Sequence, residues 1–271
     1  MKTDQRVADR RSGATSNGKR RDQVLATVIA HGQIDVAFQP QIDPVTGVVT
    51  GAEALARWDR VAGPEQLFAR AAAAGLSEQL SRLVQSKALR AAAAWEGPLR
   101  RLPISINLLA EDVVQAGFED WLLDEVKSAG IDPMRVTVEI TENALLSDLD
   151  SVGARLERLR AAGIRVALDD FGTGYASLSY LGMLPLDALK IDRELITRIG
   201  TNERDRIVVR SIFALARDLG LTVIVEGVES TAQLVLLAEW GCDLYQGFLG
   251  AGALDEVELA RFVAVSMQHA A

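Results

Sequence analysis

The feature of this sequence that most constrains its fold is a regular alternation of short apolar runs with longer segments of helical pattern, beginning near Gln33. Helical segments end at glycine and a new apolar run follows at once, as at Gly130, Gly163, Gly220 and Gly241. Glycine after the last helical residue takes the left-handed conformation that ends a helix. Such an alternation of strands and helices predicts a mainly parallel α/β fold.

Eight apolar runs are predicted to be β-strands. The first two are joined by the turn sequence Asp43-Pro-Val-Thr-Gly47, so we expect them to pair as an antiparallel hairpin. Helix-sized intervals separate the others, which we therefore expect to be parallel. Eight strands in roughly 250 residues favour a TIM-like (β/α)8 barrel, with its first strand antiparallel, over an open doubly wound sheet. The predicted strands are residues 35–39, 48–55, 102–107, 136–140, 165–169, 188–191, 222–226 and 243–246.

The chain of 271 residues is predicted to form one barrel domain over residues 23–271, preceded by a basic tail over residues 1–22. The tail carries seven basic and three acidic side chains and little apolar surface, so we expect it to be flexible. A nucleic-acid or membrane-binding arm is the alternative interpretation, but such arms carry denser charge or an amphipathic stripe.

The composition excludes several classes of function. A net charge of −8 argues against a surface that coats nucleic acid, so no DNA partner is expected. One cysteine, Cys242, and two distant histidines, His31 and His269, cannot form an internal disulfide or a structural zinc site. No apolar run approaches the length of a membrane span, and the N-terminus lacks the apolar core of a secretory signal. We therefore expect a cytoplasmic protein in which oxygen atoms hold any metal.

Polar side chains recur at or near the C-terminal ends of the predicted strands, where the active sites of such barrels are assembled. A parallel strand covered on both faces is almost wholly apolar, so each of these residues needs a reason. A solvated strand end would explain any single one, but seven strands in succession carry them. They are Glu53, Asn107, Glu139, Asp169, Asp170, Lys190, Asp192, Glu226 and Gln246.

Six of these side chains would form a ring of oxygen atoms that contains five carboxylates. Like charges this close raise each other's pKa values unless cations lie between them. Mg²⁺ and Mn²⁺ are the hard cations that carboxylate, amide and water oxygens prefer. The adjacent carboxylates would help to bring two ions close enough to activate a water and stabilise a leaving oxygen. The six residues are Glu53, Asn107, Glu139, Asp169, Asp170 and Glu226.

The same residues lie in motifs of a known family. Over about residues 30 to 260, the chain resembles the EAL-domain cyclic-di-GMP phosphodiesterases, with the motifs in matching order and spacing. The motifs are FQP at 38–40, EAL at 53–55 followed by Arg57-Trp58, SIN at 105–107, EITE at 139–142, DDFGTGYASL at 169–178, KID at 190–192, EGVE at 226–229 and QG at 246–247.

The resemblance implies a role for each position. It implies ligands of one metal ion at Glu53, Asn107, Glu139 and Asp169, and surroundings of a second ion at Asp169, Asp170 and, through water, Asp192. It implies that Lys190 orients or deprotonates the attacking water, with Glu226 supporting that water and the metal site. Substrate contacts are implied for Arg57, Gln39, Leu55 and Gln246, the last also as a polar support near the lysine. Glu142 and Glu229 are implied to anchor the loop 170–177.

The resemblance further implies hydrolysis of cyclic-di-GMP to linear pGpG by a two-metal mechanism, and a homodimer. An anionic phosphodiester can enter so acidic a site only through metal ions and Arg57. Lys190 can act as a base only if its pKa falls, and without metal the carboxylates should keep it protonated. The sequence departs from the family pattern at a few positions, none of which is an implied metal ligand or catalytic residue. They are Leu109, Asn143, Ala72 or Ala73, Ala253 and a shortened segment after Trp58.

Three alternative interpretations compete with this one. Gly172-x-Gly174 after a strand is similar to a dinucleotide fingerprint, but Ser177 replaces the third glycine and two carboxylates would face the pyrophosphate. Lys190 could form a Schiff base, which leaves the ring of oxygens unexplained. The non-enzymatic alternative is a receptor or interaction module that binds cyclic-di-GMP without cutting it.

Overall fold

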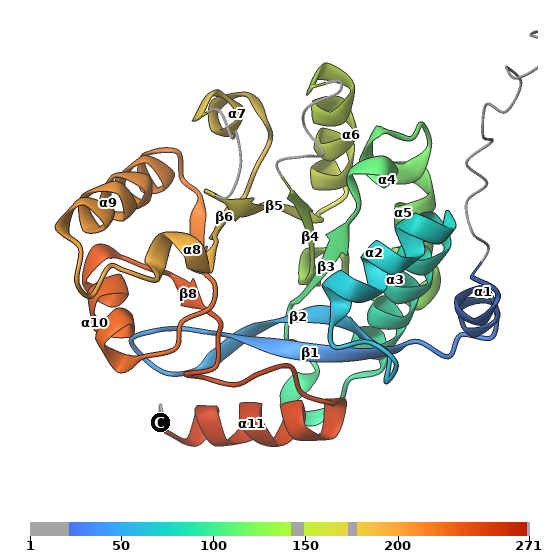
Figure 1. Ribbon diagram of the computed structural model, residues 1–271, viewed down its shortest axis with the longest axis horizontal. Coiled ribbons are helices and arrows are strands. Elements are labelled where there is room, and N and C mark those ends of the chain that lie inside the picture. The colour runs from blue at the N-terminus through green and yellow to red at the C-terminus, as the bar shows by residue number, and fades with distance from the viewer. Residues whose placement is uncertain (1–21, 142–148, 173–177, 270–271) are drawn as a thin grey trace, which may run out of the picture.

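Eight strands form a closed barrel in the order β1 to β8 in the computed structural model, which describes residues 22–141, 149–172 and 178–269 (Figure 1). Strand β1 is antiparallel to both of its neighbours, β2 and β8, and the other neighbouring pairs are parallel. The predicted (β/α)8 barrel with an antiparallel first strand is confirmed. The strands are β1 (Asp35–Ile42), β2 (Val49–Arg57), β3 (Ile104–Leu108), β4 (Val136–Thr141), β5 (Arg165–Phe171), β6 (Ala188–Ile191), β7 (Thr222–Val225) and β8 (Leu244–Tyr245).

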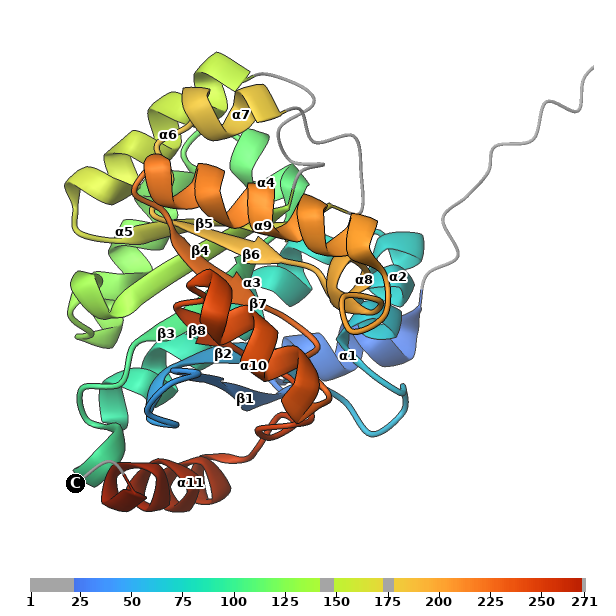
Figure 2. The same cartoon turned by 90° about the vertical axis from the view of Figure 1, so that its left-hand side faces the viewer.

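Helices follow most of the strands and lie around the barrel (Figures 1 and 2). Within the described ranges, no helix combines the length and the apolar composition needed to cross a bilayer. The predicted basic tail lies outside the described residues, apart from Asp22, which caps α1. The helices are α1 (Gln23–Ala30), α2 (Pro64–Ala74), α3 (Ser77–Ala94), α4 (Ala110–Val114), α5 (Phe118–Ala129), α6 (Leu149–Ala161), α7 (Leu178–Met183), α8 (Arg193–Ile196), α9 (Glu203–Asp218), α10 (Thr231–Trp240) and α11 (Glu256–His269), with short 3-10 turns η1 (Gly97–Leu99) and η2 (Pro133–Arg135).

The turn between β1 and β2 explains why the first strand runs against the others. The Asp43 Oδ1 atom accepts the N–H groups of Val45 and Thr46 at 2.7 and 2.9 Å. Gly47 has a φ of 70° and donates its N–H to the Asp43 carbonyl at 2.9 Å. An aspartate that bonds its own turn, followed by a residue with positive φ, reverses the chain within a few residues. Helix α11 lies beneath this hairpin in both views.

The pleat of the strands separates the apolar core outside the barrel from the inside, which holds the polar side chains of the site and a small apolar cluster of Ala167, Ala188 and Ile224. In β3, Ile104, Ile106 and Leu108 belong to the largest apolar cluster, which also includes buried residues of the surrounding helices. Side chains alternate between the two faces of a strand. Ser105 and Asn107 therefore point into the barrel, where they meet polar side chains of other strands. The apolar layer outside the barrel thus fixes which side chains face the inside.

Candidate active site

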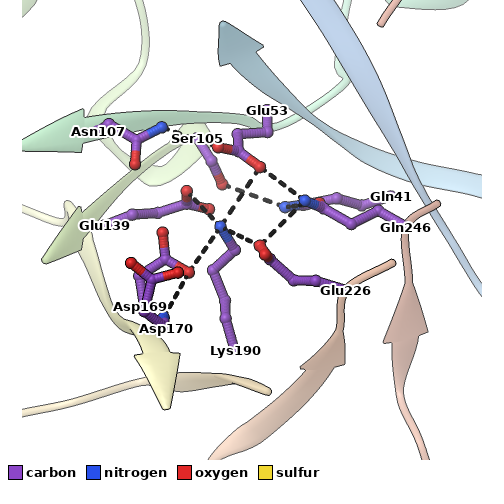
Figure 3. A network of polar contacts seen from close by, with 10 residues as sticks. All are labelled: Gln41, Glu53, Ser105, Asn107, Glu139, Asp169, Asp170, Lys190, Glu226 and Gln246. Carbon is purple, nitrogen blue, oxygen red and sulfur yellow. Dashed lines mark hydrogen bonds and ion pairs between the residues drawn. The ribbon is translucent and has the colours of Figure 1, made fainter. Parts of the chain in front are cut away.

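Four carboxylates surround the ammonium group of Lys190 at the C-terminal end of the barrel (Figure 3). The Lys190 Nζ atom lies 2.6 Å from Glu226 Oε1, 2.7 Å from Glu139 Oε2, 3.1 Å from Asp169 Oδ1 and 3.3 Å from Glu53 Oε2. Lys190 is fully buried, with none of its surface exposed. The carboxylates come from β2, β4, β5 and the residue after β7, so the closed barrel brings together side chains up to 173 positions apart, the separation of residues 53 and 226.

Two carboxamides complete the cluster and hold the Glu53 carboxylate in place. Asn107 donates its Nδ2–H to Glu53 Oε1 at 2.8 Å. Gln246 donates its Nε2–H groups to Glu53 Oε2 at 2.7 Å and to Glu226 Oε1 at 3.1 Å. The strand register also places Asn107 directly beside Glu139 in β4. Both oxygens of Glu53 are therefore oriented before any ligand binds.

A β-bulge turns two consecutive aspartates toward the same site. Between Leu168 and Phe171, β5 carries one residue more than the facing part of β6, and Asp170 has a φ of 56°. Successive side chains of a regular strand point to opposite faces, whereas a bulge re-aims a side chain. The carboxylates of Asp169 and Asp170 consequently point the same way (Figure 3). Burial, with the Asp169 charge, raises the pKa of Asp170 to about 6.

The electrostatics of the cluster are dominated by an excess of negative charge. Burial alone would lower the pKa of Lys190, but the four carboxylates outweigh it and raise that pKa well above its ordinary value. Burial and the neighbouring charges of Glu53 and Asp169 raise the pKa of Glu139, and burial is the main cause that raises the pKa of Glu226 to about 8. Burial would also raise the pKa of Glu53, but Lys190 and the two amide donors lower it. One ammonium group cannot neutralise this set.

The residues present fit divalent cations that prefer oxygen ligands. The Glu139 Oε1 atom is buried and has no hydrogen-bond partner within the described part of the chain. Oxygen atoms of Asp169, Asp170 and Glu226 all lie within 4.8 Å of one another. Carboxylate and amide oxygens in such numbers suit Mg²⁺ or Mn²⁺ rather than a soft metal. The cluster therefore has the donor set of a hard-metal site.

A cavity of about 330 Å³ opens beside the cluster. Its acidic end is formed by Glu53, Asp169, Asp170 and Glu226. The rest of its lining comes mainly from apolar side chains of β2, β3, α2 and α3, together with the polar side chains of Glu65, Ser81 and Gln85. Predicted substrate contacts Gln39, Leu55 and Gln246 all line it. A cavity with a charged end and a mainly apolar remainder suits a ligand that has both an ionic and an aromatic part.

Arg57 and Asp192 are two of the predicted site residues that do not line this cavity. Arg57, at the end of β2, donates its Nη1–H to the Ala56 carbonyl at 2.9 Å. Asp192 uses Oδ1 to cap α8, accepting the Glu194 N–H at 2.7 Å. Aspartate is a preferred cap for the first turn of a helix. Both residues therefore stand at the border of the site, with local hydrogen bonds in place.

The predicted loop anchors are only partly covered by the structure. Glu142 and the loop residues 173–177 lie outside the described residues. Glu229 is exposed, and its backbone N–H donates to Gln233 Oε1 at 3.1 Å. The anchoring roles of Glu142 and Glu229 stay predictions.

Gly247 is required by a close approach of two backbone segments. Its φ is 151°, and a Cβ at this position would lie 2.3 Å from both the N and O atoms of Val228. We expect Gly247→Ala to destabilise the protein by at least about 3 kcal/mol, because backbone atoms cannot move aside as a side chain can. Thermal unfolding measures the loss. Gly200→Ala, whose Cβ would meet nothing within 4 Å, should unfold near the wild-type temperature, and equal melting temperatures for the two variants would contradict the prediction.

The fold and the cluster define a TIM-like barrel protein. At the C-terminal end of its strands, it carries a set of oxygen donors that suits a divalent metal ion. The family model for the EAL domain matches residues 22–253, so the chain belongs to the EAL domain family.

Relatives and solved structures of the same family are similar to most of this chain. "Cyclic di-GMP phosphodiesterase NbdA" from Pseudomonas aeruginosa is 35% identical over 89% of this chain and 32% of its own length. The structure of the PaMucR phosphodiesterase in complex with c-di-GMP is 34% identical, with a TM-score of 0.80 over 87% of this chain and 97% of that one. A manganese and cyclic-di-GMP complex of Klebsiella pneumoniae BlrP1 is 32% identical, with a TM-score of 0.74 over 82% of this chain and 56% of that one. The chain spans about a third of the length of the curated relatives it matches.

Proposed function

We propose that this chain hydrolyses cyclic-di-GMP to linear pGpG with two bound Mg²⁺ or Mn²⁺ ions. The observation that carries the proposal is the contact of one buried lysine, Lys190, with four carboxylates, three from separate strands and one from the residue after β7. The names of the relatives support the substrate, since NbdA is called a cyclic di-GMP phosphodiesterase and the PaMucR structure is a c-di-GMP complex. The manganese in the BlrP1 complex supports the choice of metal.

The proposed metal-binding roles are those that the family resemblance implies, and the oxygen donors of the cluster support them. Divalent ions supply two effects when bound: they lower the pKa of water, and they offset charge on the phosphodiester. Glu226, held by Gln246, supports both the attacking water and the metal site. The proposed ligands are Glu53, Asn107, Glu139 and Asp169 for one ion, and Asp169, Asp170 and, through water, Asp192 for the other.

Lys190 is proposed to move the proton of the attacking water. The four carboxylates hold its proton while their charge is not offset, because they raise its pKa. If cations offset that charge, the pKa of Lys190 would fall and its ammonium group would release a proton to solvent. The neutral Nζ could then accept the proton of the attacking water. Arg57 would leave the Ala56 carbonyl to contact a phosphate, since a guanidinium binds phosphate oxygens more strongly than a neutral carbonyl.

Nucleotide analysis with and without metal tests the proposal. The purified chain is incubated with cyclic-di-GMP, and the products are separated by chromatography. We expect pGpG to form with Mg²⁺ or Mn²⁺, to disappear with a chelator and to return when excess metal is added. Chelator already saturated with Mg²⁺ is the control. Turnover that survives chelation would overturn the metal mechanism, and tight binding of cyclic-di-GMP without pGpG would favour the receptor alternative. The homodimer and the cytoplasmic location stay predictions.

A further inference from the structure

A buried polar network lies beside Asn107, and two of its members, Ser81 and Gln85, also line the cavity next to the acidic cluster. Its members are Gln85 and Ser81 of α3 and Asp112 of α4, whose exposed fractions are only 1, 2 and 1%. Gln85 donates from Nε2 to the Asn107 carbonyl at 2.9 Å and to Ser81 Oγ at 2.9 Å. Ser81 donates its hydroxyl hydrogen to Asp112 Oδ2 at 2.7 Å.

The direction of these hydrogen bonds fixes the orientation of the Gln85 amide. An ionised carboxylate only accepts, so the Ser81 hydroxyl hydrogen points to Asp112 and its oxygen is left to accept from Gln85. The second N–H of Gln85 then points to the Asn107 carbonyl. A flipped amide would place Gln85 Oε1 against that carbonyl oxygen. The network therefore holds one arrangement.

Gln85 acts where the pairing of β2 with β3 ends. The last registered pair between these strands is Ala54 with Ile106, one residue before Asn107. Helix α3 packs beside β3. From this helix, Gln85 donates a hydrogen bond to the Asn107 carbonyl. The side chain of the same residue donates to Glu53 Oε1 inside the barrel. Gln85 thus fixes the backbone that carries a proposed metal ligand.

The polar side chain of Gln85 lowers the stability of the fold at this buried position relative to an apolar side chain. Its Oε1 atom has no hydrogen-bond partner within the described part of the chain. A buried acceptor without a partner lowers the stability of the fold. Among the described residues, the hydrogen bonds of this side chain are the two that Nε2 donates, to Ser81 and to the Asn107 carbonyl.

We propose that Gln85 is a positioning residue that sets the affinity of the site for divalent metal by holding the backbone of Asn107. The inference rests on the proposed function, in which Asn107 is a metal ligand. Groups behind a metal ligand orient it, and their loss weakens metal binding by about 10–100-fold. The chemistry concerned is oxygen coordination of Mg²⁺ or Mn²⁺.

Calorimetric titration of the metal-free full chain with Mn²⁺ alone tests the inference. Gln85→Leu is expected to raise the dissociation constant for Mn²⁺ about tenfold or more, and Ser81→Ala to raise it by less. Leu89→Val is the matched control, because it removes one CH2 unit from a buried apolar side chain of the same helix and takes away no hydrogen-bonding group. It should lower the melting temperature and leave Mn²⁺ binding unchanged.

Asn107→Ala distinguishes a failure of this inference from a failure of the proposed function. If Asn107→Ala weakens Mn²⁺ binding and Gln85→Leu does not, the positioning role is overturned and the metal site stands. If the wild type binds no Mn²⁺, or Asn107→Ala binds it as well as the wild type, the ligand assignment fails and the positioning role fails with it.

Discussion

Replacement of Lys190 by methionine is expected to abolish hydrolysis while strengthening the binding of Mn²⁺. The ammonium group lies within 3.3 Å of four carboxylates, where it is the cation nearest to all of them in the described part of the chain. Its removal leaves those carboxylates without a counter-charge, so a divalent ion no longer competes with a resident cation. The proton acceptor proposed for the attacking water is lost at the same time, which should slow hydrolysis by about a thousandfold or more.

Without metal, Lys190→Met should be less stable than the wild type, although it should bind Mn²⁺ more tightly. Removing one partner of a buried ion pair costs about 3–5 kcal/mol, because the remaining charge stays buried and unpaired. Thermal unfolding with and without Mn²⁺ should therefore show a lower melting temperature for Lys190→Met alone and a larger rise with metal than in the wild type. Lys87→Met is the control, since Lys87 bonds only backbone carbonyls and Asp35 among the described residues. Unchanged Mn²⁺ affinity in Lys190→Met would refute the competition.

Replacement of Glu53 by alanine is expected to lose both metal binding and hydrolysis. Glu53 accepts from Asn107 and Gln246 and contacts Lys190, so its carboxylate links both amides to the ammonium group. Without it, a proposed metal ligand is missing and the amide of Asn107 has lost its acceptor. Loss of one group from a unit that acts together commonly costs about a thousandfold or more in rate.

Product analysis of Glu53→Ala beside Asp124→Ala measures this loss. Asp124 is an exposed acidic residue of α5, so its replacement removes one negative charge and leaves the site intact. We expect pGpG from Asp124→Ala at the wild-type rate and almost none from Glu53→Ala at any Mg²⁺ concentration. A Glu53→Ala variant that turns over normally at high Mg²⁺ would show that Glu53 is dispensable for the reaction.

Local patterns in the sequence were sufficient to predict the barrel. The predicted strand at residues 188–191 has the bounds of β6, and the others differ by at most three residues at either end. The turn from Asp43 to Gly47 predicted the antiparallel first strand, because aspartate and glycine at these positions reverse the chain through local hydrogen bonds. Polar residues at successive strand ends marked one end of the barrel, since parallel strands end at a common edge.

Other features of the site depend on tertiary contacts. A regular strand would place Asp169 and Asp170 on opposite faces, and only the bulge against β6 turns both toward the cluster. Gln85 lies in a helical segment with no motif, and its contact with Asn107 depends on the packing of α3 beside β3. The sequence shows only that Gln85 falls on the same face of this helix as the apolar residues Leu80, Val84 and Leu89.

By itself, the sequence determined the order of strands and helices, the hairpin at its start and the residues that stand at the strand ends, because periodicity and turn chemistry act over a few neighbouring residues. The tertiary structure alone decided that Lys190 meets four carboxylates, that two consecutive aspartates share one side, and that Gln85 holds Asn107. Each of these features depends on a tertiary contact: closure of the barrel brings the carboxylates to Lys190, pairing with β6 forms the bulge, and packing of α3 beside β3 places Gln85.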